Sequence, residues 1–99
     1  MRKFEVLHRK NPDFCSHTTV DIYDFQKVAH VLAENLDEVF ELTNHIDHDW
    51  TKNENVFVNP HLINQPRSTS VGDLIFDTEN GVFYQVDPVG FGKDFLLKR

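Results

Sequence analysis

Residues 25–46 read FQKVAHVLAENLDEVFELTNHI, and this stretch decides the fold. Apolar side chains recur along it at helical spacing, so one long helix is the first interpretation. Asn35 favours a break, because it is a preferred N-cap residue and Glu38 follows three positions later, as in a capping box. We therefore predict a strand at 27–33 and a helix at 36–46, and the single-helix alternative stays open.

Short segments on either side of this stretch have the composition of strands, being β-branched or aromatic and bounded by turn residues. Asn80 and Gly81 supply the positive φ angles that a tight hairpin turn needs. We therefore predict one α+β domain over residues 1–99, an antiparallel sheet of about four or five strands with one main helix packed on one face. The expected strands outside 25–46 are 4–7, 18–23, 56–58, 74–76 and 82–84.

The composition is that of a globular protein in a reducing compartment. Hydrophobic residues make up 39% of the 99 residues, enough for one core. The apolar runs are too short for a transmembrane helix, and no apolar segment of a secretory signal follows Arg2 and Lys3. The single cysteine, Cys15, cannot form an internal disulfide. We expect a cytoplasmic protein that does not enter membranes.

The charge balance argues against a protein that binds nucleic acid nonspecifically. Ten basic residues stand against sixteen acidic ones, which gives a net charge of −6. Phosphate-backbone binding needs a surplus of Lys and Arg. The acids concentrate in residues 34–54, where Lys52 is the sole basic residue. This segment is either a solvated helix face or a surface for a basic partner.

Residues 67–73 read RSTSVGD and form the most unusual motif. Ser68 and Ser70 can hydrogen-bond nearby backbone, and Asp73 can cap a turn into a strand. Arg67 can pair with an acid or with an anionic ligand. Two interpretations stay open, a turn held by its own hydrogen bonds or a surface that binds a ligand or partner. Trp50 has the same two interpretations, since it either packs against the sheet or anchors a partner.

A metal site or a catalytic centre is not expected. Glu41, His45 and His48 would share one face of a continuing helix, so they are weak candidates for metal ligands. An exposed polar helix end explains the same residues more simply. No catalytic constellation, phosphate-binding loop or dinucleotide fingerprint is present. We expect no cofactor and no enzymatic activity, and we name no catalytic residue.

Two segments taken in order resemble known proteins. Residues 36–47 followed by Trp50, and residues 67–75 followed by Tyr84 and then Gly90-Phe91, resemble small uncharacterised proteins of bacteriophages, especially cyanophages. The resemblance implies a phage origin and a place in the cytoplasm of the infected host cell, but no activity. The Val-Gly-Asp entry into a strand is also similar to PUA-like and ASCH-like RNA-binding barrels.

These observations favour a non-catalytic binding protein that modulates a host enzyme or defence system. Its partner would be a host or phage protein, and the edge strand at 56–58 favours a homodimer. One alternative is a nucleotide-binding or nucleotide-sequestering protein, with phosphate held near Arg67, Ser68 and Ser70. The other alternative is a PUA-like RNA-binding module.

Overall fold

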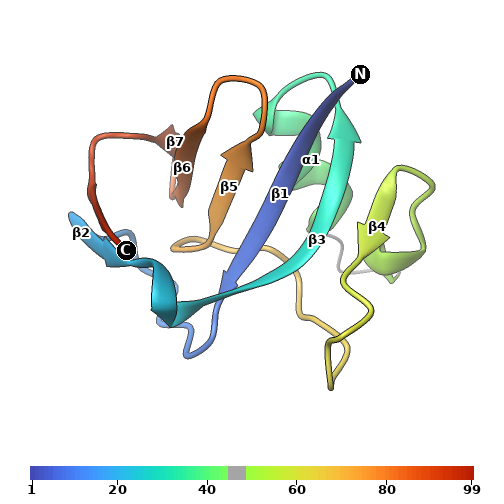
Figure 1. The fold of residues 1–99 in the computed structure, drawn as a ribbon, viewed down its shortest axis with the longest axis horizontal. Helices are drawn as coiled ribbons and strands as arrows, with labels where there is room; N and C mark the ends of the chain where they lie inside the picture. Colours follow the sequence, from blue (N-terminus) through green and yellow to red (C-terminus); the bar gives the residue numbers. More distant parts are fainter. Residues whose placement is uncertain (45–48) are drawn as a thin grey trace.

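The computed structural model describes residues 1–44 and 49–99. Its main sheet has six strands in the order β4-β3-β1-β5-β6-β7, and all neighbouring pairs are antiparallel. A separate parallel pair joins β2 to β8 near the C-terminus (Figure 1). The strands are β1 Arg2–Arg9, β2 Thr19–Asp21, β3 Phe25–Ala33, β4 Val56–Val58, β5 Leu74–Asp77, β6 Val82–Asp87, β7 Gly90–Gly92 and β8 Leu96–Lys98.

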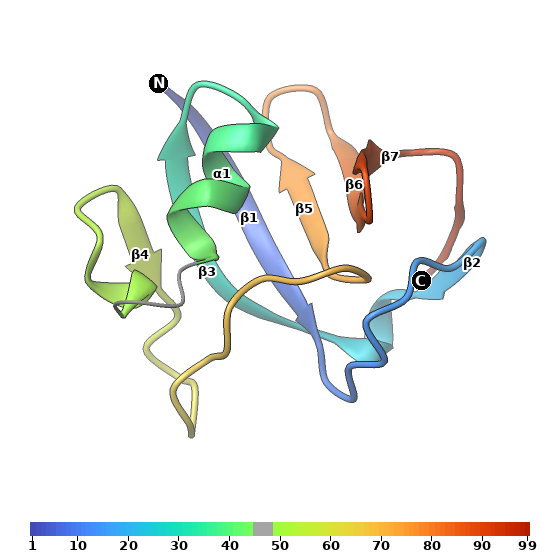
Figure 2. The ribbon, with the colours of Figure 1, turned by 180° about the vertical axis from the view of Figure 1, so that it is seen from behind.

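One α-helix, α1 (Leu36–Thr43), lies across one face of the sheet, as Figure 2 shows from the helix side. Two short 3₁₀ turns, at Ile22–Asp24 and Trp50–Lys52, complete the described elements. The predicted α+β fold with an antiparallel sheet and a single main helix is confirmed. Gly90–Gly92 joins the sheet as an unexpected strand beside β6, although glycine has little strand preference. The strand expected at 18–23 is reduced to Thr19–Asp21 and pairs with β8 outside the main sheet.

The break at Asn35 is present, so the single-helix interpretation of 25–46 is wrong. The side chain of Asn35 accepts a hydrogen bond from the Glu38 N–H at 2.9 Å. The Glu38 carboxylate in turn accepts from the Glu34 N–H at 3.2 Å. The predicted strand is two residues longer than expected and begins at Phe25.

The helix is shorter than predicted. It ends at Thr43, whereas the prediction extended it to Ile46. Tertiary hydrogen bonds meet the chain at this end, because the Thr69 N–H donates to the Thr43 carbonyl and the Asn44 side-chain amide donates to the Thr69 carbonyl. Ile46 and the neighbouring His45 lie outside the described residues.

The core lies between α1 and the sheet. Its buried members are apolar side chains that alternate along the strands, together with residues of α1 and the following turn. The most completely buried side chains include Phe4, Val6, Val31, Val39 and Ile75.

A second, smaller core lies on the opposite face. Val20, Phe25 and Leu74 form it, and Phe95 and Leu97 pack against them. The β2–β8 pair thus covers one end of the sheet face that α1 does not cover. We call this face the helix-free face. No helix in the described ranges is both long and apolar enough to span a bilayer.

Candidate functional site

The 67–73 motif folds into a clasp closed by Arg67 and Asp73. The Arg67 guanidinium donates to both carboxylate oxygens of Asp73, at 2.7 and 2.8 Å. The same carboxylate accepts from the backbone N–H groups of Ser70 at 2.8 Å and Arg9 at 2.9 Å. Asp73 is only 1% exposed. Because four donors converge on one buried carboxylate, the clasp stabilises the junction between β1 and the loop that precedes β5.

Ser68 and Ser70 belong to the same clasp. The Ser70 hydroxyl donates to the Ser68 carbonyl at 3.2 Å, and Arg67 donates to that carbonyl at 3.0 Å. The structure therefore brings together four of the residues that the sequence singled out. Five hydrogen bonds of their side chains join these residues to one another, as expected of a turn held by its own hydrogen bonds.

Gly72 lets the clasp approach the N-terminal segment. Its φ is +95°, and a Cβ atom there would lie 2.6 Å from the Cys15 carbonyl oxygen. Its N–H donates to the Val86 carbonyl at 2.9 Å. Only glycine combines this backbone conformation with such close approach.

Trp50 is a core residue that supports the clasp. Its side chain is 3% exposed, and its indole N–H donates to the Arg67 carbonyl at 3.0 Å. The ring of His8 lies 6.1 Å from the indole, centroid to centroid. Burial leaves little of Trp50 for a partner, so the structure favours the packing interpretation and we do not propose Trp50 as an anchor.

His8 adds a buried titratable group beside the clasp. Its Nε2 lies 2.9 Å from the hydroxyl oxygen of buried Thr69. Burial lowers the pKa of His8 from 6.5 to about 4; the nearby Asp73 carboxylate opposes this shift, and Arg67 adds to it. The imidazole is therefore neutral at physiological pH.

Of the three weak metal candidates, the structure describes Glu41 alone. Glu41 lies on α1 and is exposed, whereas His45 and His48 lie outside the described residues. Among residues 1–44 and 49–99, no three His, Cys, Asp or Glu side chains are placed to hold a metal ion.

A row of directly opposed side chains crosses the helix-free face, and sequence reasoning missed it. Register pairs Phe57 with His30, His30 with Glu5, Glu5 with Phe76, and Phe76 with Phe83. The row therefore runs across β4, β3, β1, β5 and β6. We call it the aromatic row. Strand alternation places each residue on a face, but the cross-strand register that aligns them is not readable from local sequence.

Rings at both ends of the aromatic row contact one another. The His30 and Phe57 rings stack with centroids 4.8 Å apart and planes 18° apart. The Phe76 and Phe83 rings lie 4.4 Å apart at 35°. Phe57 is 45% exposed, which is high for a phenylalanine.

Basic side chains surround the aromatic row. Lys27 pairs with Glu5 at 3.0 Å, and the Arg99 guanidinium lies 5.4 Å from the centre of the Phe83 ring. Partial burial lowers the pKa of His30, and the positive charges of Lys3 and Lys27 lower it further. Lys3, Lys27 and Arg99 therefore bring positive charge near these rings, whereas Glu5, which raises the pKa of His30, brings negative charge.

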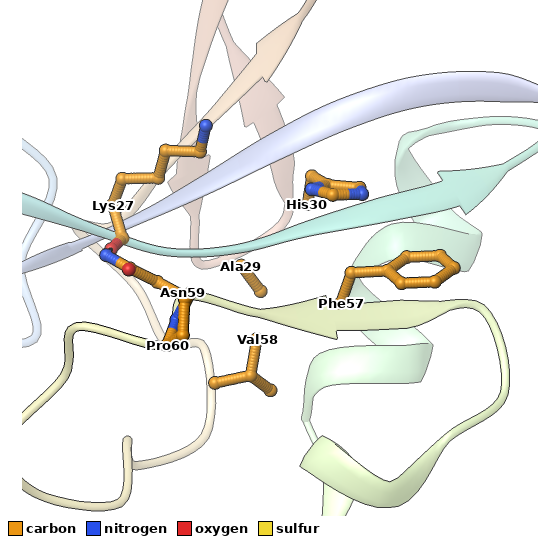
Figure 3. A pocket seen from close by; sticks show the side chains of 7 residues that line it. All are labelled: Lys27, Ala29, His30, Phe57, Val58, Asn59 and Pro60. Atoms are coloured by element: carbon orange, nitrogen blue, oxygen red, sulfur yellow. Dashed lines mark hydrogen bonds between the residues drawn. The ribbon is translucent and has the colours of Figure 1, made fainter.

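A pocket of about 300 Å³ opens over β3 and β4 at one end of the row. Figure 3 shows the stacked rings of His30 and Phe57 at one side, with Lys27, Asn59 and Pro60 at the other. The Asn59 side chain already has partners at both ends, because its amide nitrogen donates to the Lys27 carbonyl and its oxygen accepts from the His61 N–H. The pocket offers mainly aromatic surface and one lysine. Comparison of the chain with protein-family models, with curated proteins and with solved structures finds no match.

Proposed function

We propose that this chain is a non-catalytic binding protein that docks a partner protein on the helix-free face, at the aromatic row. The observation that carries the proposal is the pair of stacked rings, His30 and Phe57, with Phe57 45% exposed. Aromatic side chains contribute large contact areas at low entropic cost and are enriched in binding hot spots.

The charges around the row indicate the chemistry of the partner. Lys3, Lys27 and Arg99 carry positive charge near the rings, and the Glu5 carboxylate lies among them, paired with Lys27. A complementary partner would present an apolar patch rimmed by acidic side chains. A protein suits this surface better than nucleic acid, because one of the lysines is already paired with Glu5 and the chain carries a net charge of −6.

We extend the proposal to the setting that the resemblance implies. The protein would be encoded by a phage and act in the cytoplasm of the infected host cell. Its partner would be a host or phage protein, and binding would modulate that protein. A second copy of this chain is the competing occupant, because β4 ends the sheet and carries Phe57.

The test is a pull-down with matched variants. Wild-type protein, Phe57→Ser and Lys27→Glu serve as baits, and Val89→Ser is the control. Val89 is 98% exposed and lies in the turn between β6 and β7, away from the row. We expect one partner protein, in a fixed ratio to the bait, that wild type and Val89→Ser retain. Phe57→Ser and Lys27→Glu, the row variants, should both lose it.

Three outcomes would contradict the proposal. The control loses the partner as completely as the row variants, or nuclease treatment removes the bound material, or the row variants abolish only self-association in gel filtration. The last result would identify a second copy as the occupant. Circular dichroism of each bait shows that lost binding does not reflect lost folding.

A further inference from the structure

A second pocket, of about 270 Å³, lies at the end of β1. The segment between β4 and β5 forms its other side. Arg9, Lys10 and Arg67 line it together with the amide side chains of Gln26, Asn64 and Gln65. None of the described residues that line this pocket is Asp or Glu. Its polar lining is therefore cationic and amide, beside the apolar residues Val28, Leu62 and Ile63.

Arg9 and Arg67 differ in how their charges are compensated. Arg67 is neutralised by the bidentate pair with Asp73. The Arg9 guanidinium lies over the Phe25 ring, 4.7 Å from its centre. Its Nε and Nη2 atoms are buried and have no hydrogen-bond partner among the described residues. The hydrogen bond from the Cys15 backbone N–H is the main cause that lowers the pKa of Asp13, and the charge of Arg9 is the smallest.

Buried guanidinium N–H groups without an acceptor are costly, and a bound anion can supply the missing acceptors. Lys10 adds a second cation beside Arg9. Its ammonium donates to the Tyr23 carbonyl at 3.0 Å and has two further N–H groups. A smaller hollow of about 230 Å³ reaches Arg9 and Lys10 from the side of Tyr23, and Asp24 also lines it.

We propose that this pocket binds a small phosphate-bearing ligand, with Arg9 as the principal contact and Lys10 as the second. Phosphate accepts several hydrogen bonds at once, which suits a guanidinium, an ammonium and amide groups around one space. The volume is below that of typical sites for larger ligands, so free phosphate or the phosphate of a monoester is the ligand class. The site lies apart from the aromatic row and does not depend on the partner proposed there.

The test measures thermal stability and amide chemical shifts of the full chain. Inorganic phosphate, adenosine monophosphate and acetate are titrated at constant ionic strength. We expect phosphate to raise the melting temperature saturably, since a ligand bound only to the folded state stabilises it. The Arg9 and Lys10 amides should shift, Arg9→Gln should abolish the effect, and Lys10→Gln should weaken it several-fold.

Lys93→Gln is the control, because Lys93 is exposed and does not line the pocket. A monophosphate that competes with inorganic phosphate shows that the phosphate group is recognised. If adenosine monophosphate binds more tightly than inorganic phosphate, the smaller hollow holds the rest of the nucleotide. The proposal is overturned if phosphate does not saturate, if acetate binds equally well, or if the shifts map elsewhere. If Arg9→Gln does not fold, Lys10→Gln and the shifts in the wild type decide.

Discussion

Arg67 and Asp73 form a bidentate ion pair, with nitrogen–oxygen distances of 2.7 and 2.8 Å, across the turn that separates them. The pair also receives the Arg9 and Ser70 N–H groups on the Asp73 carboxylate. The motif that looks most like a ligand loop in the sequence thus uses its polar groups to join β1, the loop and β5. The regions with unused binding capacity lie elsewhere, at Phe57 and at Arg9.

Asp73→Asn should destabilise the protein strongly. Removing one partner of a buried ion pair leaves the other charge uncompensated, and the expected cost is about 3 kcal/mol in the free energy of unfolding. Lys27→Gln is the control, because it breaks the more exposed pair with Glu5 and should cost less than about 1 kcal/mol. Urea denaturation of both variants measures the difference, and equal losses would refute the structural role of the clasp.

Gly72→Ala should be far more damaging than Gly81→Ala. Both glycines have positive φ, at +95° and +72°, so both substitutions meet backbone strain of about 1 kcal/mol. At Gly72 the new Cβ would also lie 2.6 Å from the Cys15 carbonyl oxygen, whereas at Gly81 nothing lies within 4 Å. Thermal unfolding should show a much larger drop in melting temperature for Gly72→Ala. Similar drops would mean that the N-terminal segment does not pack on the clasp.

His8 should make the fold sensitive to mild acid. The pKa of His8 is about 4 in the fold and about 6.5 when unfolded, so the fold favours the neutral ring. Stability from this group is complete above pH 6.5 and is lost as pH falls towards 4, by about 2–3 kcal/mol at pH 4.5.

The pH effect is isolated by comparing unfolding free energies at pH 7 and 4.5 in wild type, His8→Gln and His17→Gln. His17 is the control because its side chain is not buried: it is 34% exposed and pairs with the carboxylate of Asp13. His8→Gln should lose less stability on acidification than the other two proteins. A parallel loss in all three proteins would assign the acid sensitivity to other groups.

Phe57→Ala should separate binding from stability. Phe57 is 45% exposed, so its loss should change the unfolding free energy by less than about 1 kcal/mol. Phe4→Ala removes a completely buried ring and should cost about 3–5 kcal/mol. Chemical denaturation compares them. A large cost at Phe57 would show that the ring serves the fold rather than a partner.

Local chemistry was enough to predict the strand-break-helix pattern of residues 25–43, because Asn35 and Glu38 form the N-terminal cap from positions three residues apart. It was not enough to place the helix end. That boundary depends on Asn44, whose amide binds Thr69 in a loop far along the chain. A tertiary hydrogen bond of this kind leaves no periodic signal.

The sequence by itself determined the fold class, the edge position of the 56–58 strand, the hairpin of 74–76 and 82–84, and the importance of the 67–73 segment. These follow from hydrophobic alternation, turn residues and capping, which act between neighbours. Only the tertiary structure decided that Trp50 is buried, that Arg67 binds Asp73, and that His30 and Phe57 stack on a helix-free face. Cross-strand register and long-range packing fix those relationships, because they join residues that local interactions never bring together.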